Sequence, residues 1–491
     1  MLAYNRSKQI SEGRNSMQTT RKPGIISKIK NLFGAQDMTR GKPMTNILRF
    51  AIPLLIGNFA QQLYSTVDSI IVGNYVGTEA LSAIGASLPI VNLLLVLFMA
   101  ISTGASILVA QYFGARAKEQ LVKSIGTSVT LVVLASLVIM GLGVLIAGPL
   151  LRLINTPDVY FHWARDYLVI IFLGVLGNGI YNIISGILRG LGDSFYPLVF
   201  LVVAAILNTV LDLWFVKGLG WEVAGAAWAT IIAQGVSAIL CLIRLAHMKE
   251  IIILNRESLK PDWSMGASLM KLGLPAGITQ AVFSMAMVFV QSLTNRMGTL
   301  VPALSIAVMR VDGFAMLPNF TFGLAISTYI GQNIGAGRRE RIVPGEKAAL
   351  RASLMTAFVL VLALILFGHN LISLFISNPE HRYVIDLGAR ALRTLAAGYL
   401  AMAISQVYGG ILRGAGDTMS SMYISIFTTI IVRVPLAYLI AYFTRSEAWP
   451  YGNPDALFIS LLCSWVLGAV LTYLRYRMGK WKNIKLTEKA G

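Results

Sequence analysis

Long apolar stretches recur along the whole chain, and they constrain its fold more than any other feature. Each exceeds about 18 residues, and a helix of roughly 20 residues is long enough to cross the hydrocarbon core of a bilayer. The sequence predicts twelve such spans, at residues 45–74, 80–112, 122–150, 160–187, 194–216, 222–245, 268–295, 301–332, 346–369, 385–411, 418–443 and 455–477. A β-barrel would instead show short segments of alternating hydrophobicity. The predicted fold class is therefore an all-α membrane protein with twelve transmembrane helices.

The composition of the chain agrees with this fold class. Hydrophobic residues make up 56% of the chain and charged residues only 13%, whereas a soluble domain is about 25% charged. The two cysteines, Cys241 and Cys463, lie in separate predicted spans, and they predict neither a disulfide framework nor a metal site. The enzyme motifs DDxxD, GxSxG and HExxH do not occur in the sequence, so we do not expect an enzyme.

The net charge of +19 is distributed in a way that favours a membrane over a nucleic acid as partner. Lys and Arg are concentrated in the first 42 residues, in the 244–271 linker and in the tail at 475–489, while the predicted outer loops are poorer in them, except for 380–393. The positive-inside rule then places both termini in the cytoplasm. The first 42 residues do not resemble a cleavable signal peptide. We expect the lipid bilayer, and no nucleic acid, as a partner of the basic segments.

The two halves of the chain repeat one another. GILRGLGDS at 186–194 returns as GILRGAGDT at 410–418, and VAQYFGARAKEQ at 109–120 returns as IGQNIGAGRRER at 330–341, with offsets of 224 and 221 residues. Pro53 is likewise separated from Pro275 by 222 residues. Because each half holds six spans, an even number, the halves are predicted to be parallel six-helix lobes related by a pseudo-two-fold axis along the membrane normal.

This repeat divides the chain into five predicted parts. They are a basic cytoplasmic N-terminal segment at 1–42, an N-terminal six-helix lobe at 43–245, a cytoplasmic linker at 246–267, a C-terminal six-helix lobe at 268–477 and a basic cytoplasmic tail at 478–491. A cavity between two such lobes can open alternately to each side of the membrane. The architecture therefore predicts a secondary transporter that works by alternating access.

Polar side chains inside the N-terminal spans mark a candidate cation site. They are Asn58, Gln61, Ser65 and Asp68 on one face of the first span, Asn208 and Asp212 on one face of the fifth, and Thr230 in the sixth. A charged residue at the centre of a span costs about 2.5–3.5 kcal/mol, so each one needs a reason. Carboxylate, amide and hydroxyl oxygens suit Na⁺ and equally a proton carrier. The alternative is that each aspartate caps or cross-links helices.

The C-terminal half does not repeat these carboxylates. By the offsets of the repeat, Asp68 corresponds to Val290 and Asp212 corresponds to Leu436. Cation coupling is therefore predicted to reside in the N-terminal lobe.

Other polar residues do occur in the C-terminal spans. The seventh span carries Gln280, Ser284 and Gln291, and later spans carry Arg310, Asp312 and Arg433 in apolar surroundings. We interpret Asp312 and Arg433 as a structural ion pair rather than as a second coupling site, since a buried charge needs a partner.

The motifs together resemble those of the multidrug and toxic compound extrusion family. They are Pro53 with TVDSIIVG at 66–73, GQNIGAGR at 331–338, the paired LRGxGD turns, and Asn208 and Asp212 with GAAWAT. The resemblance extends from about residue 45 to 477 and implies cation-coupled export through a V-shaped, two-lobed bundle.

The resemblance also implies roles for individual residues. Asp68, Asn208, Asp212 and Thr230 occupy the positions where members of the family bind Na⁺ or exchange protons. Pro53 falls where the first helix bends, and either Asn178 or Asn182 supplies a further asparagine near the site. One branch of the family has an acidic residue after the proline of the seventh helix, and here that stretch reads Phe283, Ser284, Met285, which favours a site in the N-terminal lobe only.

The predicted function is a monomeric, multi-pass secondary antiporter in the plasma (inner) membrane of a prokaryote. It is expected to export organic cations, drugs or metabolites in exchange for H⁺ or Na⁺, without an organic cofactor. Its predicted substrate pathway and helix-bending residues are Pro53, Asn58, Gln61, Tyr64, Asn178, Asn182, Gln280 and Ser284. The alternative is a flippase for a lipid-linked precursor. That function calls for several cationic residues in the cavity, for which only Arg310 and Arg433 are candidates.

Overall fold

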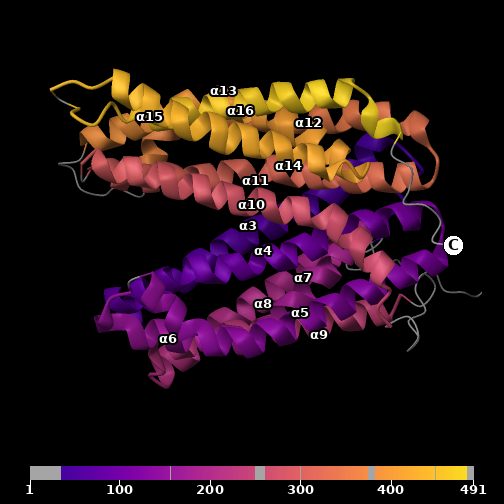
Figure 1. The fold of residues 1–491 in the computed structure, drawn as a ribbon, viewed down its shortest axis with the longest axis horizontal. Helices are drawn as coiled ribbons and strands as arrows, with labels where there is room; N and C mark the ends of the chain where they lie inside the picture. The colour runs from indigo at the N-terminus through magenta and orange to yellow at the C-terminus, as the bar shows by residue number, and fades with distance from the viewer. Residues whose placement is uncertain are drawn as a thin grey trace, which may run out of the picture.

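The computed structural model is a bundle of long helices in two lobes, with the N-terminal half of the chain in one and the C-terminal half in the other (Figure 1). It describes residues 35–154, 156–248, 260–298, 300–373, 382–447 and 449–483. Most of the predicted N-terminal segment, of the linker between the lobes and of the basic tail lies outside the described residues.

The N-terminal lobe contains six spans. They are α3 (Pro43–Tyr75), α4 (Thr78–Gly114), α5 (Lys118–Leu153), the pair α6 (Asp158–Leu173) and α7 (Val175–Gly190), α8 (Phe195–Asp212) with the π-helix η1 (Leu213–Gly218), and α9 (Glu222–Ala246). The span predicted at 160–187 is broken rather than straight, because α6 and α7 are bent by 51°. The break is at Gly174, where a Cβ atom would lie 2.2 Å from the side chain of Ile231 in α9.

The C-terminal lobe also contains six spans. They are α10 (Trp263–Arg296), α11 (Leu300–Gly335), α12 (Ile342–Ser373) after the short turn η2 (Arg339–Arg341), α13 (Arg382–Gly414), the series α14 (Thr418–Ile426), η4 (Phe427–Arg433) and α15 (Val434–Phe443), and α16 (Asp455–Arg477) before η5 (Lys480–Asn483). The middle piece of that series, η4, is a π-helix, as η1 is in the other lobe.

By length and composition, ten of the described helices can each cross a membrane, and the α6 and α7 pair makes an eleventh. α3, with 33 residues, is the twelfth span. Its polar side chains lower its mean hydropathy. The predicted fold class, an all-α membrane protein with twelve transmembrane helices in two six-helix lobes, is confirmed.

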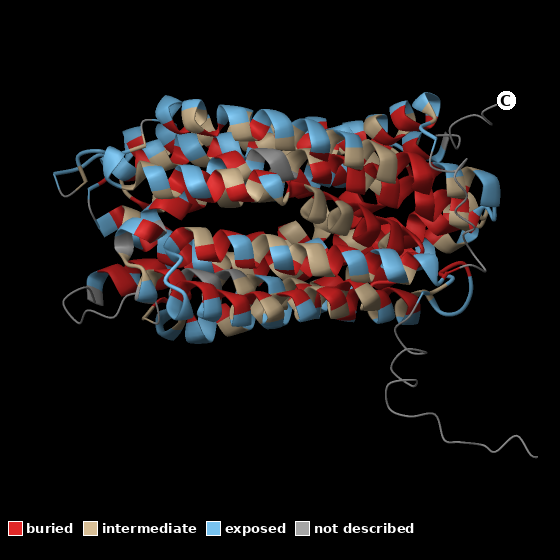
Figure 2. Cartoon of the chain, turned by 90° about the horizontal axis from the view of Figure 1, so that it is seen from below, coloured by how far each residue is buried: buried red, intermediate tan, exposed pale blue. Residues whose placement is uncertain are grey.

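The first halves of α3 and α10 are exchanged between the lobes. Ile47, Phe50, Ala51 and Leu54 of α3 are buried in a core cluster of the C-terminal lobe, and Met265, Leu269 and Leu272 of α10 are buried in one of the N-terminal lobe. The lobes are therefore joined at the end where both helices begin, and they diverge toward the other end (Figure 1). We call these the joined end and the far end. Figure 2, which views the molecule from below, shows many buried residues toward the joined end.

Glycines allow the backbones of the two lobes to touch at the joined end. They are Gly104 and Gly114 of α4, Gly273 of α10 and Gly335 of α11, and a Cβ atom on each would lie 1.9–2.1 Å from a carbonyl oxygen of a helix from the other half of the chain. No side chain fits at such a distance. The present conformation therefore depends on glycine at these contacts.

Candidate functional site

Three residues of the predicted cation site lie together inside the N-terminal lobe. Asn208 and Asp212, near and at the end of α8, are 1% and 0% exposed. The side-chain Nδ2 of Asn208 donates a hydrogen bond to Oγ1 of Thr230 in α9, at 3.4 Å. α8 and α9 pack against each other, and the four-residue spacing puts Asn208 and Asp212 on one face of α8.

The backbone changes at this cluster. α8 ends at Asp212, and the chain continues without a break as the π-helix η1. π-helical turns are rare and are frequently found at functional sites, because the extra residue in the turn alters which side chains face inward. The position of η1 next to Asp212 therefore supports a functional reading of the cluster.

Asp68 belongs to α3, and its side chain lies outside the described residues, as does that of Ser65. α3 packs along α8 and touches η1, so the helix that carries Asp68 runs beside the cluster. The pairing of Asp68 with Asp212 stays a prediction.

The cluster has one oxygen atom with unused bonding capacity among the described residues. Oδ1 of Asn208 is buried and has no hydrogen-bond partner among the described residues. Leaving such an oxygen unsatisfied costs about 1–3 kcal/mol, which a bound cation would recover. Together with the hydroxyl of Thr230 and the buried carboxylate of Asp212, this oxygen suits a hard cation such as Na⁺, and the carboxylate alone suits a proton.

Asn178 and Asn182 form a separate pair on α7. Nδ2 of Asn182 donates to Oδ1 of Asn178 at 2.8 Å and to its backbone oxygen at 2.9 Å. Within the described parts of the chain, no hydrogen bond joins this pair to Asn208 or Thr230. Because the two asparagines are bonded to each other, the choice between them stays open.

Asn58 lies at the contact between the lobes. Its Nδ2 donates to Oγ1 of Thr321 in α11 at 3.1 Å. The ring of the next residue, Phe59, stacks on Phe314 of α11 with 6.0 Å between ring centroids. This part of the predicted substrate pathway therefore spans both lobes.

The other pathway residues of α3 surround this contact. Pro53 is buried and does not interrupt α3, which is one continuous helix. It lies between the first half of α3, which packs in the C-terminal lobe, and the second half, which packs on α8. Gln61 is exposed and Tyr64 is half-buried, one and two turns after Asn58. Pro53 thus stands where a bend would redirect one half of α3 relative to the other.

The inter-lobe face continues on the helices of the C-terminal lobe. Gln280 lies seven residues after Gly273, which contacts α4, and Ser284 follows one turn later; both are exposed. Arg310 is also exposed and lies one turn from Phe314 on the same face of α11. These residues extend the face toward the far end.

The polar centre of the C-terminal lobe differs from the ion pair that we predicted. The hydroxyl of Tyr399 donates to Oδ1 of Asp312 at 2.9 Å. Arg433 is 5% exposed. The ion pairs of the described residues do not include a direct contact between Asp312 and Arg433. Among the described residues, Asp312 is therefore bonded to Tyr399 rather than paired directly with Arg433.

Two glutamines that the sequence analysis did not single out connect the lobes at the joined end. Nε2 of Gln111 donates to the backbone oxygen of Gly414 at 3.0 Å, and Nε2 of Gln332 donates to that of Gly190 at 3.0 Å. Each glutamine thus binds the LRGxGD turn of the opposite lobe. The repeated motifs were the signal for this contact, since both glutamines and both glycines belong to them.

The aspartates of the two LRGxGD turns form ion pairs within their own lobes. Asp193 pairs with Arg244 at 3.0 Å, and Asp417 pairs with Arg475 at 2.7 Å. Burial raises the pKa of the Asp193 carboxyl, and its hydrogen bonds, including the one from Arg244, oppose that rise. These two ion pairs therefore stabilise the LRGxGD turns to which Gln111 and Gln332 donate hydrogen bonds.

Comparisons with known proteins agree with this architecture. The family model of MatE matches residues 53–214 and 275–439. The chain is 31% identical over 456 residues to the probable multidrug resistance protein YpnP of Bacillus subtilis (strain 168), an alignment that covers 93% of this chain and 100% of the relative. It is 23% identical over 404 residues to the FAD transporter of Shewanella oneidensis, covering 81% and 88% of the two chains.

Solved structures show the same fold. A crystal structure of MATE in the bent conformation matches with a TM-score of 0.83 and 25% identity, covering 91% of this chain and 97% of that one. An outward-facing multidrug resistance MATE family transporter matches with a TM-score of 0.84 and 24% identity, covering 92% and 99%. The chain therefore belongs to the MatE family, and it is a multidrug and toxic compound extrusion (MATE) transporter, not an enzyme.

Proposed function

We propose that the protein is a monomeric antiporter that exports organic cations, drugs or metabolites in exchange for inward H⁺ or Na⁺. The observation that carries the proposal is the group of the buried Asn208 and Asp212 with the half-buried Thr230. By the offset of the repeat, Asp212 corresponds to Leu436, so the carboxylate has no counterpart in the C-terminal lobe. A carboxylate inside a membrane bundle is costly and marks an ion or proton pathway by default. The multidrug resistance proteins among the relatives support drugs as substrates.

The coupling ion would act through α3. The first half of α3 is buried with the C-terminal lobe, and its second half lies beside the cluster. Binding of a cation or proton at Asp212, with Asp68 on α3 as the second carboxylate, would change the position of α3 relative to the two lobes. Full switching from 1:99 to 99:1 needs about a 10⁴-fold difference in ion affinity between the two conformations. Competition between ion and substrate then gives exchange.

The proposed substrate pathway is polar but mostly uncharged. It contains Asn58, Gln61, Tyr64, Gln280 and Ser284 on the inter-lobe face, with Asn178 or Asn182 on α7 and Pro53 where a bend in α3 would form. Amide and aromatic groups hold organic cations without the desolvation cost of a second buried charge. Such a surface accepts several substrates of similar chemistry.

The proposed orientation places the joined end in the cytoplasm. This end carries Arg116, Lys118, Arg338, Arg339, Arg341, Arg475 and Arg477, and the positive-inside rule assigns such an end, with both termini, to the cytoplasmic side of the inner membrane. The lobes diverge at the opposite end (Figure 1). The conformation described here would then release substrate outward, which agrees with its similarity to an outward-facing relative.

Transport by purified protein in liposomes tests this function. When H⁺ or Na⁺ flows down an imposed gradient, an ethidium-type organic cation should be transported in the opposite direction. Asp68→Asn should abolish that transport. Arg339→Gln, an exposed substitution far from the cluster, should transport normally. Absence of gradient-driven transport in folded wild-type protein would exclude the proposal for this substrate class.

A flippase for a lipid-linked precursor is the second candidate. Arg310 favours it, because an exposed cation on the inter-lobe face could meet a phosphate. Translocation of a fluorescent lipid diphosphate that is lost in Arg310→Gln, without any ion dependence, would support the flippase over the antiporter.

A further inference from the structure

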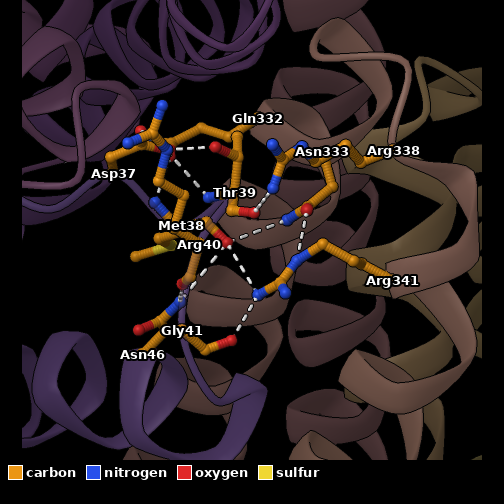
Figure 3. A network of polar contacts seen from close by, with 10 residues as sticks. All are labelled: Asp37, Met38, Thr39, Arg40, Gly41, Asn46, Gln332, Asn333, Arg338 and Arg341. Carbon is orange, nitrogen blue, oxygen red and sulfur yellow. Dashed lines mark hydrogen bonds and ion pairs between the residues drawn. The ribbon is translucent and has the colours of Figure 1, made fainter.

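Residues 36–41, just before α3, fold against the joined end of the molecule (Figure 3). We call them the clasp. Met38 is 0% exposed and Thr39 is 6% exposed, although both precede the first span. Met38 belongs to the core cluster that the first half of α3 shares with the C-terminal lobe. The clasp is therefore an integral part of the packing at this end.

The C-terminal lobe holds the clasp through its backbone. The bonds run from Met38 N to Oε1 of Gln332 at 2.9 Å, from Asn333 Nδ2 to Met38 O at 3.2 Å, from Arg338 Nη1 to Thr39 O at 2.7 Å and from Arg341 Nη2 to Gly41 O at 2.8 Å. Nε of Arg341 also donates to Oδ1 of Asn333 at 3.0 Å, which orients both side chains. Hydrogen bonds from charged donors are stronger than neutral ones. The two arginines are therefore the main anchors of the clasp.

The clasp also touches the N-terminal lobe. Gln36 N donates to the backbone oxygen of Gly192 at 3.3 Å. Gly192 has a φ of +82°, and a Cβ atom on it would lie 2.3 Å from Gln36 O. Gln332 meanwhile binds both Met38 and Gly190. The clasp thus links the end of α11 to the LRGxGD turn of the other lobe.

The clasp binds Gln332, one of the two glutamines of the joined end. Gln111 and Gln332 occupy equivalent positions in the repeat and bind equivalent turns. Gln332 also accepts a hydrogen bond from the backbone of Met38 in the clasp. The clasp therefore adds a contact to Gln332, beside its bond to the LRGxGD turn of the N-terminal lobe.

We propose that the clasp is a conformational latch: it holds the first half of α3 on the C-terminal lobe and stabilises the conformation in which the lobes are joined at this end. The clasp's links to Gly192 and, through Gln332, to Gly190 must break before the lobes separate here. This inference rests on the alternation between two conformations proposed above, but not on the identity of the substrate or the ion.

Distances across the joined end measure the latch directly. Spin labels would be placed at Lys118 and Lys347, which are exposed on opposite lobes, in a full-length protein whose Cys241 and Cys463 are replaced. In lipid nanodiscs, Arg338→Gln with Arg341→Gln should raise the ratio of separated to joined molecules roughly tenfold or more, as the loss of two charged hydrogen bonds implies. Arg339→Gln, in the same turn but without a bond to the clasp, is the matched control.

A second variant keeps the test independent of these arginines. Replacing residues 36–41 by a Gly-Ser segment of equal length should give the same shift, while deletion of residues 1–34 should not. Distance distributions equal to wild type in both the arginine and the Gly-Ser variants would overturn the latch. The readout needs no transport, so a failure of the proposed antiport would be seen separately, in liposomes.

Discussion

Gly335 of α11 lies against the backbone of α4 with no room for a side chain. A Cβ atom there would lie 1.9 Å from the backbone oxygen of Gln111 and 2.8 Å from its carbonyl carbon, whereas real Cβ contacts stay beyond 3.0 Å. In Gly335→Ala the two backbones must therefore move apart by about 1 Å, because packed interiors have no free volume to absorb the methyl group.

That movement would break the joint between the lobes. The bonds from Gln111 to Gly414 and from Gln332 to Gly190 are both 3.0 Å long, so a shift of this size removes them. Each buried group left unsatisfied costs about 1–3 kcal/mol, and overpacking adds about 1–3 kcal/mol. The total of roughly 3–9 kcal/mol favours separation of the joined end. Even the lower value changes the ratio of the two conformations on the order of 100-fold.

The Lys118 and Lys347 spin-label pair should therefore report mostly separated molecules in Gly335→Ala. Gly141→Ala is the matched control, because a Cβ atom at Gly141 of α5 meets nothing within 4 Å. Gradient-driven export should fall at least tenfold in Gly335→Ala, since the cycle needs both conformations. A folded Gly335→Ala protein with the distances of wild type would refute the close approach described here.

Three further substitutions separate coupling from stability. Asn208→Ala removes an oxygen of the proposed ion site and should weaken the ion dependence of transport about tenfold; an unchanged ion dependence would exclude Asn208 as a ligand. Tyr399→Phe removes the donor to Asp312 and should lower the unfolding free energy by about 1–3 kcal/mol, seen in thermal melts; altered ion dependence instead would give the C-terminal lobe a coupling role. Arg475→Gln leaves Asp417 without its cation and should cost about 3 kcal/mol of stability; an unchanged melting temperature would show that this pair contributes nothing.

The spans were predictable from the sequence because membrane thickness sets their length. Predicted ends such as 418–443 and 455–477 coincide with the ends of the α14 to α15 series and of α16. The break at Gly174 was not predictable, since the apolar run continues through it. It arises from the approach of Ile231, a contact distant in the sequence.

Side-chain partners were predictable only where helical spacing alone decides them. Asn208 and Asp212 share a face because they are four residues apart. Tyr399 as the partner of Asp312 had no such signal, because tyrosines in spans mostly serve packing. The exchange of the first halves of α3 and α10 between the lobes was also not predictable. An apolar helix face has the same sequence pattern whichever lobe buries it. The clasp lacks any periodicity, and its contacts in the structure, such as those with Arg338 and Arg341, reveal it.

The most direct test of coupled exchange is to measure ion flux that is driven by a substrate gradient alone. Liposomes containing the protein would be given a gradient of an organic cation, with no initial H⁺ or Na⁺ gradient, and ion flux would be recorded for wild type and Asp212→Asn. If the protein is an antiporter, substrate that moves down its gradient drives H⁺ or Na⁺ in the opposite direction in wild type, and folded Asp212→Asn loses this ion flux. Substrate movement without any ion flux in wild type would contradict antiport.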